Sequence, residues 1–452
     1  FNEDKPVQFG NIRAVKELGS VANQLGKKRT LSETYGGGGW ELTFKDMKRL
    51  ADWEFVLGVN FMNQHLSFMT ITGARKYDYP PSFSYHEPWW PFYKTLNQYF
   101  SRLSLCLSTG QQKNDILVLE PTTSAWMYYF RGKENKRFFE IGKRFNDFVI
   151  TLQRAHAEYD LGSENIIKDQ GKVENGKFVI GQRAYSTVVI PPGMDNIDLP
   201  TFNLLKEYAI QGGKVVLFEK PGSLDGDNND DLNFFASSNM VQAINADMQQ
   251  IIQNHLLPSD ISISAAGSNK VGGNLYYQRR HLSDGQLIFL SNASMEASSK
   301  GLLTVNGKDA LIMNLFNGEI CSYPVKENSG KVTFEFDIPP AGSMMFFVAD
   351  KKQSGFSAFI PEGDKTLVKT HPARVYRPVE NTLMIDFCDL ELKKPDTTYK
   401  DLHVGVASNT AFKHFGFTDG VGNPWNNHTQ FKDRIVARDT FSTGTGYVAT
   451  YH

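Results

Sequence analysis

The chain has 452 residues, too many for one ordinary hydrophobic core, so three or four domains are expected. Its 48 Lys and Arg nearly balance its 49 Asp and Glu, and the formal net charge of −1 argues against nucleic acid or an anionic membrane as partner. Aromatic residues make up 13%, a content usual in proteins that stack on sugars, although core packing takes most of them.

The cysteines and the hydropathy pattern give further limits. Cys106, Cys321 and Cys388 lie far apart, which excludes a C-x-x-C site and allows one disulfide at most. No apolar run approaches 18 residues, so no membrane span is predicted. The first residue is Phe1, and no signal peptide precedes the first helical pattern, so we expect the true N-terminus to lie upstream.

The first region, 1–112, alternates helices and strands. Apolar residues recur at three- and four-residue spacing over 11–25 and 44–55, which predicts two amphipathic helices. Lys28 to Ser32 reads as a short strand, and VLGVNFMNQHL, residues 56–66, as a buried one. Alternation of this kind is typical of parallel α/β folds, in which functional groups gather at strand ends.

Residues 73–91 hold four prolines and six aromatics and predict an irregular aromatic loop, followed by a helix over 93–108. A second region, 113–255, repeats the α/β rhythm, with strands at DILVLEP, YSTVVIPP and GGKVVLFEKP and helices over 137–159 and 199–210. This pattern predicts a small doubly wound domain. No G-x-G-x-x-G or P-loop motif follows its strands, so nucleotide binding is not expected.

The last two regions have the texture of β structure. Strands alternate over 256–364 in NLYYQRRHL, GQLIFLSN, DALIMNLF, KVTFEFDI and SMMFFVAD, which predicts an antiparallel sandwich. The pattern renews over 365–452, and we expect a partial β-sandwich there.

The stretch RTLSETYGGGGW, residues 29–40, offers the best candidate for catalysis. Glu33 is a carboxylate at the end of a predicted parallel strand, where glycosidases place the group that attacks the sugar or activates water. A loop acid without chemistry is an equal alternative. The four glycines that follow allow either an anion-binding turn or a close approach of the backbone to a ligand. No Lys-Ser or Lys-Thr follows them, which weakens the phosphate reading.

Further polar and aromatic residues are candidates for sugar contacts. His65, Asn60 and Asn63 lie near the end of the next predicted strand, although a lone histidine is more often structural. The predicted substrate-binding residues are Tyr35, Trp40, Asn60, Asn63, His65, His86, Glu87, Trp89 and Trp90. For the two adjacent tryptophans, packing of a proline-rich loop is an equally good explanation. No zinc, EF-hand or G-x-S-x-G pattern is present.

Residues 27–93 contain the motifs S-E-T-Y-G, D-W-x-x-x-x-G-V-N, N-x-H-L-S, G-A-R-K-x-D-Y-P-P and E-P-W-W-P. This combination covers about a seventh of the chain closely and resembles glycoside hydrolase family 106, the α-L-rhamnosidases. It implies the C-terminal part of a (β/α)8 catalytic barrel, followed by a flavodoxin-like domain, a β-sandwich and a partial, galactose-binding-like sandwich.

The resemblance also implies chemistry. The family is calcium-dependent and inverting, which makes Glu33 the expected general base. A complete barrel takes about 250 residues, so the acid partner and most calcium ligands are expected upstream of this chain, which should be inactive alone. We expect a periplasmic or secreted bacterial enzyme that releases terminal α-L-rhamnosyl groups from plant or bacterial polysaccharides. The alternatives are a β-galactosidase-like retaining enzyme and a non-catalytic carbohydrate-binding protein.

Overall fold

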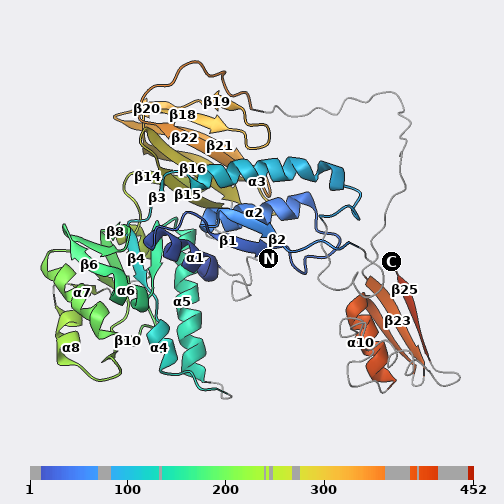
Figure 1. The fold of residues 1–452 in the computed structure, drawn as a ribbon, viewed down its shortest axis with the longest axis horizontal. Coiled ribbons are helices and arrows are strands. Elements are labelled where there is room, and N and C mark those ends of the chain that lie inside the picture. Colours follow the sequence, from blue (N-terminus) through green and yellow to red (C-terminus); the bar gives the residue numbers. More distant parts are fainter. Residues whose placement is uncertain are drawn as a thin grey trace. The chain divides into compact units, whose positions relative to one another are not determined.

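The structure is a computed structural model, shown in Figure 1, and it describes residues 12–69, 83–131, 135–238, 241–243, 248–266, 275–361, 387–393, 396–415 and 446–451. The chain divides into two compact units. The first comprises 1–32, 45–63 and 95–363, and the second comprises 33–44, 64–94 and 364–452. This division does not follow the four predicted domains, whose boundaries stay predictions.

The first elements of the chain are two helices and two short strands. Helix α1 (Ile12–Gln24) and helix α2 (Phe44–Leu57) confirm the two predicted amphipathic helices. Strands β1 (Leu31–Thr34) and β2 (Phe61–Gln64) form a two-stranded sheet. Two hydrogen bonds, from Phe61 N to Thr30 O and from His65 N to Thr34 O, advance in the same direction along both segments, so the pair is parallel.

The predicted strand over 56–66 was too long, and β1 extends further than predicted. Val56 and Leu57 belong to α2, which ends at Leu57, directly before Gly58. Gly58 has φ +128°, and a Cβ atom there would lie 3.2 Å from the Cα of Gly19. The left-handed conformation and the close approach to α1 break the helix at this glycine, and the strand starts three residues later.

A five-stranded parallel sheet organises the region after residue 113. Its order is β13-β11-β9-β4-β5, and the strands are β4 (Ile116–Leu119), β5 (Tyr159–Gly162), β9 (Thr187–Ile190), β11 (Lys214–Leu217) and β13 (Val241–Ala243). Strands β4, β9 and β11 confirm the strands predicted at DILVLEP, YSTVVIPP and GGKVVLFEKP. In sequence order the sheet reads 2-1-3-4-5, one of the common orders of doubly wound sheets.

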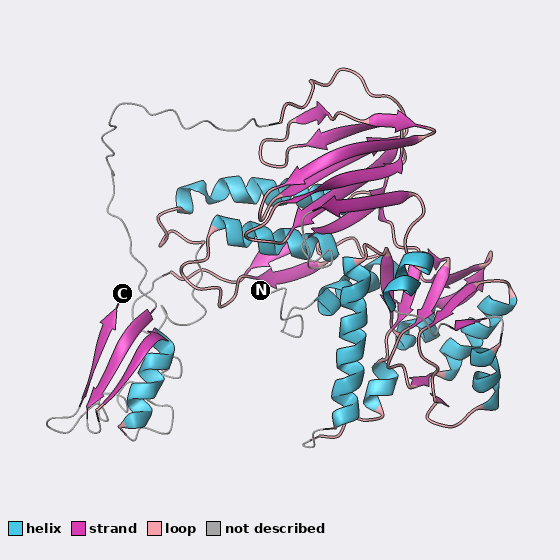
Figure 2. Ribbon diagram, turned by 180° about the vertical axis from the view of Figure 1, so that it is seen from behind, coloured by secondary structure: helices cyan, strands magenta, loops and turns pink. Residues whose placement is uncertain are grey.

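Helices flank this sheet, as Figure 2 shows. They are α4 (Thr122–Trp126), α5 (Lys136–Arg154), α6 (Glu164–Gln170), α7 (Leu199–Ile210), α8 (Asp230–Ser237) and α9 (Met248–His255). Leu117, Leu119 and Val188 share one buried cluster with Phe202 and Leu205 of α7. Helix α7 has the predicted bounds, because its apolar residues supply this face of the sheet.

The predicted helix over 137–159 was wrong at its C-terminal end. Helix α5 ends at Arg154, and His156 adopts φ 62°, a left-handed conformation that interrupts a helix. The following residues, Tyr159–Gly162, form the fully buried strand β5 and pair with β4. Smaller sheets in the same region were not predicted: β6 (Gly171–Glu174), β7 (Lys177–Ile180) and β8 (Arg183–Tyr185) form one, and β10 (Asn196–Ile197) with β12 (Ser223–Leu224) another.

Two antiparallel sheets follow. One has the order β14-β17-β21-β20 and the other β19-β18-β22-β16-β15-β3. The strands are β3 (Gln111–Gln112), β14 (Ile261–Ala266), β15 (Leu275–His281), β16 (Gly285–Asn292), β17 (Ser299–Asn306), β18 (Asp309–Met313), β19 (Ile320–Ser322), β20 (Lys326–Asn328), β21 (Lys331–Ile338) and β22 (Ser343–Ala349). Residues of both sheets, among them Leu303, Phe334 and Phe346, share one buried core. The five predicted strands are confirmed.

Helix α2 and helix α3 (Tyr93–Ser108, as predicted) lie beside these antiparallel sheets in Figures 1 and 2. Tyr99 of α3 is buried, and its hydroxyl lies 2.7 Å from both Asp52 Oδ1 and Ser343 Oγ. Lys48 of α2 forms an ion pair with Asp52 at 2.5 Å and donates to Ser343 Oγ at 2.8 Å. This buried polar network fixes the two helices against strand β22.

Near the C-terminus a three-stranded antiparallel sheet packs against one helix. Its order is β24-β23-β25, and the elements are β23 (Phe387–Lys393), β24 (Thr397–His403), β25 (Gly446–Tyr451) and α10 (Val404–His414). Cys388, Leu390 and Leu392 face Ala407 and Ala411 in a small core.

Cys106, Cys321 and Cys388 are all free thiols. None of the described helices has the length and apolar character that crossing a bilayer requires.

Candidate active site

Glu33 and His65 meet where strands β1 and β2 end. Glu33 lies on β1, and 55% of its side chain is exposed. His65 follows β2 directly, and its backbone N–H donates to Thr34 O at 2.7 Å. The His65 Nδ1 atom lies 2.5 Å from Glu33 Oε1. The structure therefore brings together the two residues that the sequence placed at neighbouring strand ends, and it makes His65 a partner of the carboxylate.

The turn after β1 is conformationally unusual. Tyr35 is a buried non-glycine residue with φ 75°, a conformation that costs on the order of 1–3 kcal/mol and clusters at functional sites. Its ring centroid lies 6.1 Å from that of Phe83. Gly37 and Gly39 have φ 68° and 88°. The backbone leaves the strand in a tight turn and not in a helix that could receive a phosphate.

The glycine run packs against residues of the chain itself. A Cβ atom on Gly36 would lie 3.1 Å from Cγ of His65, and one on Gly38 would lie 2.9 Å from Leu42 Cδ2. The predicted close approach of the glycine backbone to a ligand stays a prediction, and the group that the backbone approaches at Gly36 in the structure is the imidazole of His65.

The described part of the aromatic loop, 83–92, has a packed interior and exposed rings. Tyr93 stacks on Phe83 and Trp90 with centroid distances of 6.0 and 5.4 Å. Trp90 is 41% exposed, and Trp89 is half-buried. His86 is half-buried, and its Nε2 lies 3.0 Å from Phe68 O. Trp90 thus combines the packing role and the exposed ring face that the sequence left as alternatives.

Glu87 is buried and was predicted as a sugar ligand. Only 4% of its surface is exposed, and its Oε2 atom has no hydrogen-bond partner among the residues that the structure describes. Burial raises the pKa of Glu87 to about 7, so the carboxyl holds a proton well above the usual range of a glutamate. A group buried in this way does not present a carboxylate to a sugar at the surface.

Asn60 has a structural role in place of the predicted sugar contact. It is 7% exposed; its Oδ1 accepts from Thr30 N at 3.0 Å and its Nδ2 donates to Lys28 O at 2.9 Å. These bonds tie the segment before β2 to the segment before β1. Asn63 on β2 is exposed, and Trp40 is half-buried.

No metal site is found among the described residues: no group of three or more His, Cys, Asp or Glu side chains lies close enough to hold an ion. The expected calcium dependence stays a prediction, and no chemical step is derived through calcium.

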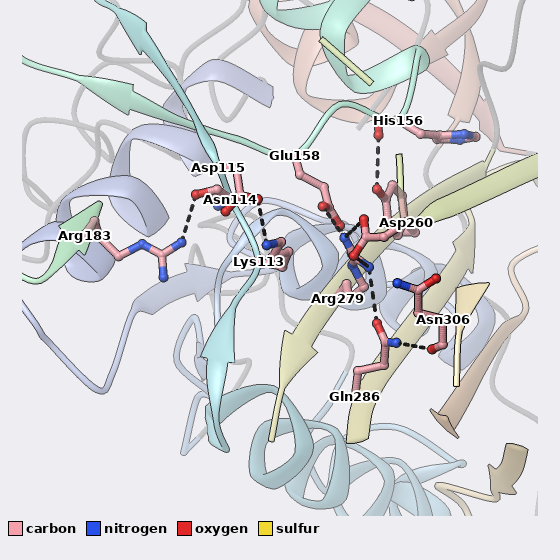
Figure 3. Close-up of polar contacts among 11 residues, drawn as sticks. Lys113, Asn114, Asp115, His156, Glu158, Arg183, Asp260, Arg279, Gln286 and Asn306 are labelled. Atoms are coloured by element: carbon pink, nitrogen blue, oxygen red, sulfur yellow. Dashed lines mark hydrogen bonds and ion pairs between the residues drawn. The ribbon is translucent and has the colours of Figure 1, made fainter. Parts of the chain in front are cut away.

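A second polar cluster, which the sequence did not predict, surrounds Arg279 on β15 (Figure 3). Its guanidinium donates to both oxygens of Glu158 at 2.7 and 2.6 Å, to both oxygens of Asp260 at 2.9 and 3.0 Å, and to Gln286 at 3.3 Å. Burial opposes its charge, but the bonds to Glu158 and Asp260 outweigh that effect and raise the pKa of Arg279. The sequence does contain a sign of this burial. Arg279 lies two residues after Tyr277 and four after Leu275, so on a strand it points to the same side as these buried residues.

A polar cavity of about 310 Å³ adjoins this cluster. Lys113, Asp115, Glu158, Ser186 and Asp260 are among its lining residues. Lys113 pairs with Asp115 at 2.6 Å, and both carboxylates near Arg279 are bound by it. Because these charges are satisfied within the chain, the cluster serves as a junction between the parallel sheet and strand β15.

The site and the mixed architecture point to a class of protein. Glycoside hydrolases use two carboxyl groups as acid and base or nucleophile. The site at the end of β1 offers one exposed carboxylate, that of Glu33, which is bonded to the imidazole of His65. A family model described as alpha-L-rhamnosidase, Glyco_hydro_106, matches residues 2–323, more than half of the 452-residue chain. The chain belongs to glycoside hydrolase family 106.

Comparison with solved structures agrees on the fold. A rhamnosidase from Novosphingobium sp. PP1Y aligns with a TM-score of 0.60 and 17% identity, covering 89% of this chain and 38% of that chain. At this identity the match shows a shared fold alone, and the chain spans 38% of that rhamnosidase's length. Among curated proteins, no significant match was found.

Two GH42 enzymes resemble the chain less well. An exo-carrageenase from Bacteroides ovatus has a TM-score of 0.45 and 10% identity, covering 69% of this chain and 39% of that chain. A catalytic mutant of a β-galactosidase from G. stearothermophilus also has a TM-score of 0.45 and 10% identity, covering 68% of this chain and 51% of that chain.

Proposed function

We propose that the protein is an inverting α-L-rhamnosidase that releases terminal α-L-rhamnosyl groups from plant or bacterial polysaccharides, and that Glu33 is its general base. The observation that carries this proposal is the Glu33 carboxylate, half-exposed at the end of β1 and bonded to His65 at 2.5 Å. Membership of the rhamnosidase family supplies the reaction class.

The proposed chemistry uses two carboxyl groups. Glu33 takes a proton from water as the water oxygen bonds to the anomeric carbon, while a carboxylic acid protonates the leaving oxygen. In inverting enzymes the two groups lie about 6.5–9.5 Å apart. We place the acid on another strand of the catalytic barrel. Trp40, Asn63, His86, Trp89 and Trp90 remain proposed sugar contacts, whereas the buried Tyr35 side chain packs against Phe83.

The finer architecture belongs to the same proposal. The alternation of β1, α2 and β2, with a parallel strand pair, supports the C-terminal part of a (β/α)8 barrel. The parallel order 2-1-3-4-5 supports a flavodoxin-like domain, and the two antiparallel sheets with one core support a β-sandwich. A partial galactose-binding-like sandwich over 365–452, calcium binding and a periplasmic or secreted location rest on the resemblance to the family.

Glu33→Gln in the full-length enzyme tests the role of the base. The amide keeps the size of the side chain but cannot accept the proton from water, so turnover of an aryl α-L-rhamnoside should fall about 10²–10⁴-fold. Glu41→Gln, the same change at an exposed residue of the adjacent segment, is the control and should keep normal rates. Circular dichroism should show both variants folded. Near-normal turnover in Glu33→Gln would overturn the assignment.

Product analysis separates the three candidate functions. Proton NMR of the first turnovers should show the inverted anomer of rhamnose. A retained anomer would favour the β galactosidase-like mechanism, and sugar binding without hydrolysis would favour a non-catalytic carbohydrate-binding protein.

A further inference from the structure

We propose that His65 is a positioning residue for Glu33, and that Gly36 in turn fixes the imidazole ring of His65. The proposal rests on the proposed role of Glu33 as the base. It replaces the direct sugar contact predicted for His65 with an indirect role, and it gives the first glycine of the run a definite function.

An exposed glutamate needs a partner if it is to act as a base. Its side chain has three rotatable bonds, whereas a catalytic group has to be held within about 0.5 Å of its working position. Glu33 is 55% exposed, so packing does not hold it. The bond to His65 Nδ1 at 2.5 Å supplies the missing restraint. A carboxylate able to take a proton from water only accepts hydrogen bonds, so the Nδ1 atom of His65 has to carry the proton that they share.

His65 is itself fixed from two directions. Its backbone N–H donates at 2.7 Å to the carbonyl oxygen of Thr34, the residue that follows Glu33. This bond holds the backbone of His65 beside the end of β1. Only 27% of its side chain is exposed. The position of the ring therefore depends on the register of β1 and β2, and the same register places the carboxylate of Glu33 next to the imidazole of His65.

Gly36 completes the arrangement by leaving room for the ring. A Cβ atom there would lie 3.1 Å from Cγ of His65 and 3.3 Å from both its Cβ and Cδ2. Distances this short force the ring to move by a few tenths of an ångström. Unlike Gly37 and Gly39, Gly36 does not have a positive φ. An alanine would therefore suit the backbone, and what requires glycine at this position is the imidazole.

Three substitutions of His65 in the full-length enzyme test the positioning role on an aryl α-L-rhamnoside. His65→Ala should lower kcat about 10–100-fold, the usual cost of losing a partner that orients a reacting group, and should change KM little. His65→Asn places an amide N–H near the position of Nδ1 and should recover most of the loss, whereas His65→Gln places it near Nε2 and should not. A raised KM with unchanged kcat in His65→Ala would identify a sugar contact and overturn the proposal.

A double-mutant cycle tests Gly36. Gly36→Ala should lower kcat about 10-fold in the native background and have no further effect on His65→Ala, because the two changes act through one ring. Additive losses would overturn the role of Gly36. Gly142→Ala is the matched control, since a Cβ at this helical glycine meets nothing within 4 Å, and it should leave kcat unchanged.

A crystal structure of His65→Ala separates this proposal from the proposed function. Positioning predicts that the Glu33 carboxylate moves or loses its single conformation, whatever the activity. An unchanged Glu33 would overturn positioning even if Glu33→Gln is inactive. A displaced Glu33 together with a fully active Glu33→Gln would support the contact and refute the role of the base.

Discussion

Replacing Arg279 by methionine should destabilise the junction between the parallel sheet and strand β15 more than any surface change. The Arg279 side chain is fully buried and donates five hydrogen bonds, four of them to the carboxylates of Glu158 and Asp260. Glu158 is 7% exposed, so methionine would leave its charge buried without a counter-ion. Removing one partner of a buried ion pair costs about 3–5 kcal/mol of unfolding free energy.

Urea unfolding followed by far-UV circular dichroism measures this loss. Lys143→Met is the control, because the Lys143 and Asp147 side chains are 71% and 49% exposed and an i,i+4 pair of this kind contributes at most about 0.5 kcal/mol. If the unpaired charge causes the loss, adding Glu158→Gln to Arg279→Met should recover at least about 1 kcal/mol, since a neutral amide is cheaper to bury. A loss below about 1 kcal/mol in Arg279→Met, or no recovery in the double variant, would refute the reasoning.

Two further predictions concern Glu87 and Gly58. The pKa of Glu87 is raised to about 7 from an ordinary 4.5, so its contribution to stability is present below pH 4.5 and is lost as the pH rises to 7. Glu87→Gln should therefore make the unfolding free energy less dependent on pH over this range and should stabilise the chain at pH 8. Urea titrations at several pH values measure this, and an unchanged pH dependence in Glu87→Gln would contradict it. Gly58→Ala should cost about 1–3 kcal/mol, because φ is +128° and the Cβ would lie 3.2 Å from Gly19 Cα. Gly142→Ala, in an open helical position, should be neutral or stabilising by up to about 1 kcal/mol, and equal melting temperatures for the two variants would exclude the effect of strain at Gly58.

Elements with a regular apolar period were predictable from the sequence. Helices α1, α2, α3 and α7 repeat their apolar residues every three to four positions, and their predicted bounds agree with the structure within a few residues. The buried runs of β4, β9 and β11 and the alternating strands β15, β16 and β21 were predictable for the same reason. In each case one face or the whole segment is apolar, and burial of that face selects the element.

Errors arose where one apolar run continues through a change of element. Val56, Leu57 and Val59 form an apolar run without a polar residue, but the conformation of Gly58 ends helix α2 after Leu57. The sequence before Tyr159 looks helical throughout, and the left-handed His156 is what separates α5 from β5. Periodicity reports which residues are buried, and it does not report where the backbone turns.

The sequence alone determined that a carboxylate and an imidazole stand at neighbouring strand ends, because strand ends are marked by the polar residues that follow apolar runs. Tertiary structure decided what those residues do. In the folded chain Glu33 is bonded to His65, and Gly36 lies against the imidazole. Both ends of the Asn60 amide form hydrogen bonds to the segment before β1, and Glu87 is buried. Hydrogen-bond partners and burial depend on strand register and on contacts between distant segments, and no local pattern of residues encodes either.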